Sequence, residues 1–132
     1  MKPNETTKTI EDRAINHIVS YLKKHKKIKR KDIKVVKRGI DIIAGDLWIE
    51  AKGCNKKESN IRITPQSLDY VAEQGKLKNY FIYYVYSMNK DPKLLIFDYQ
   101  TFKKHRHIEI KYIIQPSKIR RETGKPEIID LK

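Results

Sequence analysis

Apolar residues occupy alternate positions on both sides of the pair Gly45-Asp46, which predicts two β-strands joined by a tight turn. A Gly-Asp pair suits a two-residue hairpin turn, and such a turn places Ile43 opposite Trp48. Because side chains alternate between the two faces of a strand, one face of this hairpin is wholly apolar. That face carries Ile40, Ile42, Ala44, Leu47, Ile49 and Ala51. We expect it to lie against the core of the protein.

Apolar periodicity also predicts the elements on either side of the hairpin. Apolar residues at helical spacing predict a helix from about Thr9 to Lys24, and Thr64-Pro65 is a good start for a second helix that ends near Gly75. Short runs of β-branched and aromatic residues predict further strands at about 33–36, 80–87 and 94–98. The run at 80–87 is nearly continuous, as in a strand that is covered on both faces.

The resulting order of helix, strand, strand, strand, helix and strand predicts an α/β fold with a central mixed sheet flanked by helices. The hairpin is antiparallel, whereas the strand–helix–strand unit over 47–87 predicts a right-handed parallel crossover. The chain has 132 residues, the size of one domain, so we expect 1–132 to form a single domain. We expect residues 1–8 and about 116–132 to be mobile or arm-like, with a strand as a further alternative for the second segment.

The other face of the hairpin places two carboxylates side by side. Asp41 is expected directly opposite Glu50, with Lys52 one step further along the same face. Like charges paired across strands repel each other, by about 3 kcal/mol at a separation of about 5 Å and an effective dielectric constant of ~20. This repulsion needs compensation, for which three alternatives exist: a bound cation, a proton on one carboxyl, or neutralisation by Lys52. Oxygen ligands at this spacing suit Mg²⁺.

These residues resemble the signature of the PD-(D/E)XK nuclease superfamily, whose fold is called restriction-endonuclease-like. The signature consists of Asp41, a gap of eight residues and then Glu50-Ala51-Lys52, although Ile40 stands where the family name has Pro. The resemblance implies a catalytic site in which Asp41 and Glu50 hold Mg²⁺, or Mn²⁺ in its place, with the backbone carbonyl of Ala51. It also implies that Lys52 orients or activates the attacking water and steadies the charge that develops on the phosphate. The predicted order of elements matches the common core of the superfamily.

The resemblance adds three residues on the predicted helices. Glu11 lies in the first turns of the first helix, where many superfamily members carry a further acidic metal ligand; the alternative is an ordinary acidic residue near a helix N-terminus. Gln66 and Tyr70 share one face of the second helix and resemble a Gln-x-x-x-Tyr motif of RecB-like members, which contacts substrate near the cleft. The alternative for this pair is a solvated Gln and a Tyr packed on the sheet.

The charge of the chain favours a polyanionic partner. The formal net charge is +14, from 30 Lys plus Arg against 16 Asp plus Glu, which indicates nucleic acid first and an anionic membrane surface second. The densest basic run spans residues 23–38. Its candidates for contact with substrate phosphates are Lys29, Arg30, Lys31, Lys37 and Arg38. No base-reading motif is recognisable, so we expect binding that is led by the backbone or the shape of DNA.

No part of the sequence predicts a membrane-spanning or secreted protein. The longest apolar run, at 81–86, is too short to span a bilayer, and residues 1–7 lack the apolar core of a signal peptide. Cys54 is the only cysteine, so no internal disulfide can form. A reducing cytoplasm is therefore the expected location.

We therefore expect a Mg²⁺-dependent deoxyribonuclease that hydrolyses phosphodiester bonds, acting as an endonuclease. The chain resembles small archaeal Holliday-junction resolvases, which act as dimers, and the catalytic modules of Mrr-type restriction enzymes. The sequence leaves open to which of these branches of the superfamily the chain is more similar, and a homodimer is among the expectations. Two alternatives remain: a non-catalytic basic nucleic-acid-binding protein, and an RNA-cleaving enzyme with the same metal site.

Overall fold

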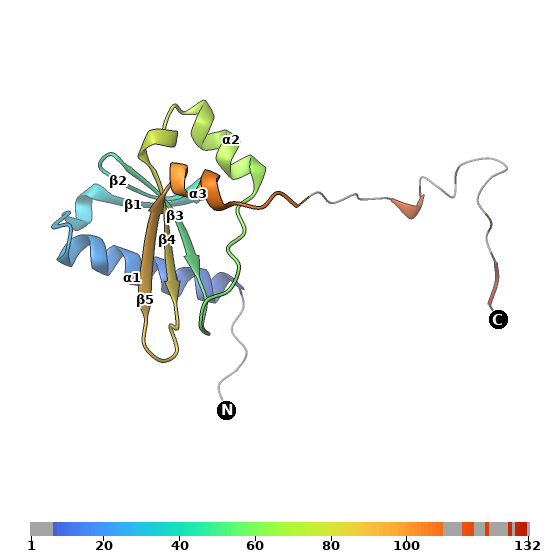
Figure 1. Ribbon diagram of the computed structural model, residues 1–132, viewed down its shortest axis with the longest axis horizontal. Coiled ribbons are helices and arrows are strands. Elements are labelled where there is room, and N and C mark those ends of the chain that lie inside the picture. Colours follow the sequence, from blue (N-terminus) through green and yellow to red (C-terminus); the bar gives the residue numbers. More distant parts are fainter. Residues whose placement is uncertain (1–6, 110–114, 118–120, 122–126, 128, 132) are drawn as a thin grey trace.

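A computed structural model describes residues 7–109, 115–117, 121, 127 and 129–131. Its elements are α1 (Thr7–Lys24), β1 (Ile33–Arg38), β2 (Ile40–Ala44), β3 (Leu47–Gly53), α2 (Pro65–Glu73), β4 (Tyr80–Tyr86), β5 (Lys93–Asp98) and α3 (Tyr99–His105), with the short 3-10 turns η1 (Arg30–Asp32) and η2 (Leu77–Asn79) (Figure 1). The predicted α/β class and the order of the first six main elements are confirmed. Most of residues 1–8 and 116–132 lie outside the described residues, so the expectation for these segments stays untested.

The sheet has five strands in the order β1-β2-β3-β4-β5. Only β3 and β4 run parallel, and α2 connects them; the other neighbouring pairs are antiparallel. The sheet is therefore mixed and flanked by helices, which is consistent with a restriction-endonuclease-like core. No helix in the described part of the chain combines the length and the apolar composition that a membrane span requires.

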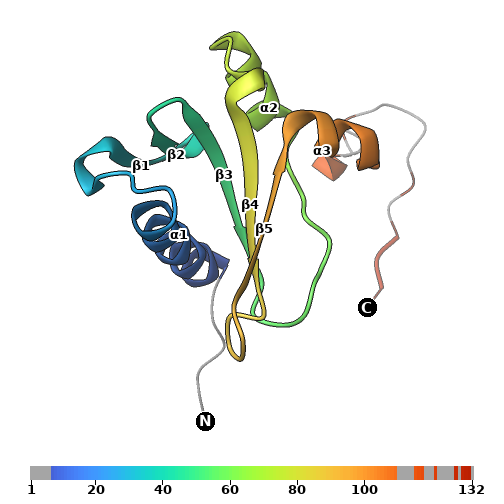
Figure 2. The ribbon, with the colours of Figure 1, turned by 60° about the vertical axis from the view of Figure 1, so that its left-hand side comes forward.

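The sheet separates two apolar clusters, and Figure 2 shows α1 on one side and α3 on the other. One cluster packs α1 against the sheet, and the second packs α2 and α3 against it. The central strand β4 serves both clusters: Tyr83 and Val85 belong to the first, and Tyr80 and Ile82 to the second. The prediction that this strand is covered on both faces is confirmed, because alternate side chains enter opposite cores.

The hairpin forms with the expected register, since Ile43 pairs with Trp48 and the neighbouring pairs follow. The predicted apolar face does lie on the α1 cluster for Ile42, Ala44, Ile49 and Ala51, with Leu47 partly buried beside them. The prediction is wrong for Ile40, which is buried in the α2 cluster instead. The alternation breaks there because the chain enters β2 from an irregular turn. Helix α3 was not predicted, although the Asp98 carboxylate caps it by accepting from Thr101 N–H at 2.9 Å.

The irregular turn arises from a bulge in β1 that faces Asp41. The register between β1 and β2 shifts after Val35, so residues 36–37 of β1 stand opposite the single Asp41. Lys37 carries this shift with a φ of 58°, a conformation that residues other than glycine seldom adopt. Bulges of this kind re-aim side chains, and here the bulge sets the direction in which β2 begins.

Gly39 lets α2 dock directly on the chain that leads into β2. Its φ is 77°, and a Cβ atom at this position would lie 2.5 Å from Cδ1 of Tyr70. The Tyr70 ring also packs on Trp48 of β3, with 6.3 Å between ring centroids. The backbone just before Asp41 is therefore held under an aromatic ring, and only a residue without a side chain fits there.

We predict that Gly39→Ala destabilises the protein by about 1–3 kcal/mol more than Gly45→Ala. Both glycines have positive φ, so alanine costs about 1–2 kcal/mol of backbone strain at either position. Only Gly39 adds an overlap with Tyr70, since a Cβ atom at Gly45 meets no atom within 4 Å. Urea unfolding of both variants measures the difference. Equal losses in the two variants would contradict the close packing of Tyr70.

Candidate active site

Asp41 lies at a fork between β2 and β3. Counted from the turn, the two strands pair as far as Ile42 and Ile49. The first two residues of β2, Ile40 and Asp41, lie beside β1 and no longer pair with β3. The backbone N–H of Ala51, which has no partner on β2, donates to Oδ2 of Asp41 at 2.8 Å. The expectation that Asp41 pairs directly with Glu50 across the strands is therefore corrected: the ladder ends one step earlier, and the Asp41 side chain replaces the missing backbone acceptor.

The two carboxylates nevertheless interact, and Lys52 joins them. Asp41 and Glu50 are 9% and 6% exposed, and they are the buried charged side chains of the described residues. Nζ of Lys52 lies 3.2 Å from Oε1 of Glu50, while the Lys52 side chain keeps 34% of its surface exposed. Glu50 and Lys52 share a face of β3 because they are two positions apart. The lysine therefore links a buried acid pair to solvent.

Burial raises the pKa of both carboxyls. The pKa of Asp41 rises to about 7, first through burial and then through the negative charge of Glu50, against a lowering by the Ala51 N–H. Burial also raises the pKa of Glu50, and Lys52 opposes this shift. One of the three expected compensations, the ion pair with Lys52, is thus present in the structure, and the raised pKa of Asp41 favours a second, a proton on one carboxyl. The third, a divalent cation, would compete with the proton for the same oxygens.

Glu11 reaches the acid pair from α1, on the other side of the sheet. Its carboxyl raises the pKa of Asp41 through its charge and a hydrogen bond, and its charge also raises the pKa of Glu50. Gly53, at the end of β3, makes this approach possible because a Cβ atom there would lie 2.8 Å from Cβ of Ala14. The neighbouring Asp12 pairs with Lys37 instead, and its side chain is 42% exposed.

The donor set fits a hard divalent cation. Asp41, Glu50 and the Ala51 carbonyl offer oxygen ligands, and carboxylate, carbonyl and water ligands suit Mg²⁺ and Mn²⁺. The described residues contain no group of three or more His, Cys, Asp or Glu side chains spaced to share a metal ion. Two carboxylates with one backbone oxygen and water do not need such a group. Glu11 acts electrostatically on both carboxyls, and its ligand role stays a prediction.

The two residues of the predicted Gln-x-x-x-Tyr pair lie in different environments. Gln66 is exposed at the start of α2, whereas Tyr70 is half-buried against Trp48 and Gly39. Tyr70 thus has a packing role beside the fork, and Gln66 is free of the core. Their contact with substrate stays a prediction.

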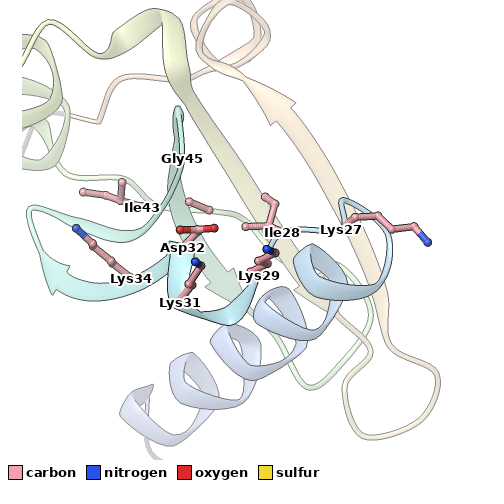
Figure 3. Close-up of a pocket in the computed structure, with 9 residues that line it drawn as sticks. Lys27, Ile28, Lys29, Lys31, Asp32, Lys34, Ile43 and Gly45 are labelled. Atoms are coloured by element: carbon pink, nitrogen blue, oxygen red, sulfur yellow. The ribbon is translucent and has the colours of Figure 1, made fainter.

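The predicted phosphate contacts fall into two groups. Lys29 and Lys31 line a hollow of about 610 Å³ at the Gly45 end of the hairpin, with Lys27 and Lys34 (Figure 3). Lys37 and Arg38 lie at the other end of β1, next to the turn before Asp41. The Arg30 side chain is exposed, and its guanidinium donates to the Ile33 carbonyl at 2.6 Å. The basic run therefore follows the edge strand β1 from the hollow to the acid pair.

Sequence reasoning did not foresee the packing roles of the two glycines that shape the site. Gly39 positions the backbone before Asp41, and Gly53 lets α1 bring Glu11 close. The available signal was their position, since each lies two residues or fewer from a charged residue of the motif. Spacing along the chain does not show which helix presses on a glycine, so the signal alone was too weak.

We predict that Asp41→Asn stabilises the metal-free protein above pH 7. The Asp41 pKa rises from 3.8 to about 7 on folding, so the folded state binds this proton more tightly than the unfolded state does. The resulting stabilisation is present at acid pH and is lost as the pH rises through about 7. Asparagine keeps an acceptor for Ala51 N–H and carries no charge, so the gain at pH 8 is as much as about 4 kcal/mol and vanishes towards pH 4.

Urea unfolding of wild type and Asp41→Asn in chelator, over this pH range, measures the difference. Asp46→Asn is the matched control, because Asp46 is exposed in the turn of the same hairpin. The difference in stability between this variant and the wild type should be the same at pH 4 and at pH 8. The interpretation of the buried pair is wrong if Asp41→Asn gains no stability at pH 8.

Comparison with known families identifies the family to which this chain belongs. The model of the family described as Protein NO VEIN, C-terminal, matches residues 10–97. This segment covers more than half of the chain, runs from the first turns of α1 to β5, and contains Glu11, Asp41, Glu50 and Lys52. Comparisons with curated proteins and with solved structures gave no match. The chain belongs to the NO VEIN C-terminal family.

Proposed function

We propose that this protein is a metal-dependent nuclease that hydrolyses phosphodiester bonds of DNA, as an endonuclease. One observation carries the proposal: two buried carboxylates, Asp41 and Glu50, meet at a strand fork beside the ammonium group of Lys52. Burying two like charges destabilises a fold, and such arrangements cluster at functional sites. The order and pairing of the strands around the fork support the resemblance to PD-(D/E)XK nucleases.

In this mechanism Asp41, Glu50 and the Ala51 carbonyl would hold Mg²⁺ or Mn²⁺. The bound ion supplies positive charge to the scissile phosphate and favours the ionisation of water. Ala51 N–H fixes the Asp41 carboxylate in place at 2.8 Å. The Lys52 ammonium, which is anchored by Glu50 and one-third exposed, orients the attacking water and donates to the phosphate oxygens. The charge of Glu11 favours the protonated form of Asp41 in the metal-free protein.

The basic edge of the sheet supports a nucleic-acid substrate. Lys37 and Arg38 flank the site at one end of β1. Lys34 at the other end of β1, with Lys29 and Lys31 just before the strand, lines the hollow near Gly45. A net charge of +14 attracts the phosphate backbone over a distance of about one Debye length, roughly 8–10 Å at moderate salt. We propose that this edge holds the backbone of DNA and reads no bases.

We predict that cleavage needs Mg²⁺ or Mn²⁺ and falls at least about 10²-fold in Asp41→Asn and in Lys52→Met. The substrates are supercoiled plasmid, linear duplex DNA, four-way junction DNA and a matched RNA duplex, each with Mg²⁺, with Mn²⁺ and with chelator. The controls are Asp46→Asn and Lys57→Met, because both residues are exposed and lie close to the site residues in sequence. Both controls should cut at the rate of the wild type.

Each outcome of the cleavage assay selects one reading. Cutting of supercoiled plasmid indicates an endonuclease, and cutting of RNA alone would favour an RNA-cleaving enzyme. Tight binding without cleavage of any substrate, equal in wild type and Asp41→Asn, would overturn the nuclease proposal in favour of a binding protein.

We predict that replacing Lys29, Lys31 and Lys34 by Gln lowers the salt dependence of DNA binding. Each lost phosphate contact removes about 0.9 from the slope of log K against log salt, so the triple variant should lose about 2–3. The control triple variant replaces Lys90, Lys103 and Lys104 by Gln. These exposed lysines lie in the connection that leads into β5 and on α3 after it, and β5 is the opposite edge strand. Fluorescence anisotropy with labelled duplex in chelator measures both slopes. A similar loss in both variants would mean that net charge, and not the β1 edge, governs binding.

A further inference from the structure

Tyr80 buries a hydroxyl that has no hydrogen-bond partner. The residue is fully buried at the start of β4, and its hydroxyl is the unpaired buried side-chain polar atom of the described residues. Phenylalanine would fill almost the same volume without burying a polar group. The hydroxyl is therefore a disadvantage to the metal-free fold, and packing alone does not explain it.

The register places this hydroxyl on the face of the acid pair. β3 and β4 are parallel, and Tyr80 stands beside Trp48 while Ile82 stands beside Glu50. Because side chains alternate, Tyr80 shares a face with Glu50. The ring also packs in one cluster with Ile40, the residue before Asp41. The sequence predicts that this strand is covered on both faces, and it gives Tyr80 no role at the acid pair.

The electrostatic environment agrees with this geometry. After burial, the negative charges of Glu50 and Asp41 raise the pKa of the Tyr80 hydroxyl further. The hydroxyl therefore keeps its proton and can donate a hydrogen bond to an ionised carboxylate. Hydrogen bonds to the charged form of a carboxylate favour ionisation, which is the form that binds a metal ion.

We infer that Tyr80 is a positioning residue of the candidate metal site, whose hydroxyl donates to the Asp41–Glu50 carboxylates, directly or through one ordered water, once both are ionised. This inference rests on the proposed function. Partners in such a position typically change metal affinity by about 10- to 100-fold, because they orient the ligands and favour their charged form.

The test is Mn²⁺ binding by the full chain, followed by electron paramagnetic resonance. We expect Tyr80→Phe to weaken Mn²⁺ affinity at least about 10-fold, and Asp41→Asn to abolish measurable binding. Tyr83→Phe is the matched control, because Tyr83 is a buried tyrosine of the same strand that belongs to the α1 cluster. It should bind Mn²⁺ within about twofold of the wild type. Thermal unfolding in chelator should show that both Phe variants are folded.

The outcomes separate this inference from the proposed function. If Asp41→Asn loses Mn²⁺ while Tyr80→Phe binds like the wild type, the role of Tyr80 is overturned and the metal site stands. An equal loss in Tyr80→Phe and Tyr83→Phe would indicate general loosening of the core and would also overturn it. If the wild type binds no Mn²⁺ at millimolar concentration, the proposed function and this inference both fail.

Discussion

The hydrogen bond from Ala51 N–H to the Asp41 carboxylate is the interaction on which the candidate site depends. A backbone N–H at a strand edge needs an acceptor. β2 pairs with β3 only from Ile42 to Ala44, so it offers no backbone acceptor to Ala51. The Asp41 side chain fills this place, so it is drawn into the space between two separating strands. The same hydrogen bond places the Ala51 backbone next to Asp41. Asp41 therefore satisfies the backbone of β3 and is also a candidate metal ligand.

The packing around the fork explains why the strands separate there. On one side the β1 bulge at Lys37 and the turn at Gly39 direct β2 away from β3, and Tyr70 presses on that turn from α2. On the other side Gly53 lets α1 approach the end of β3 closely, which brings Glu11 to the same point. Two helices on opposite faces of the sheet therefore converge on one irregularity.

The electrostatics of the site oppose the stability of the metal-free fold. Two carboxyls with raised pKa values lie at the fork, and their charges act on the unpaired hydroxyl of Tyr80. Among the described residues, the Lys52 ammonium and the Ala51 N–H compensate the two acids. Proteins retain such groups mainly where a ligand or a reaction uses them. A divalent cation would satisfy the acids at once, and the basic β1 edge would bring a polyanion to it. These features have one common explanation in the proposed nuclease site.

The sequence by itself determined the elements whose signals are local. The hairpin register followed from Gly45-Asp46 and strict alternation, the helix start from Thr64-Pro65, and the strand at 80–87 from its continuous apolar run. The acid pair and Lys52 were also visible, since their spacing along two strands is local. The pattern missed α3, whose seven residues form a weak periodic signal.

Only the tertiary structure decided how these parts meet. It placed Ile40 in the second core, ended the ladder before Asp41, brought Glu11 to the acids, and split the basic run between the hollow and the site. It also showed that the buried Tyr80 hydroxyl has no hydrogen-bond partner among the described residues and shares a sheet face with Glu50, which is distant in sequence. Periodicity tells which face of an element is apolar, but it does not tell which element covers that face. Side-chain packing across the sheet sets that choice, and with it the geometry of the site.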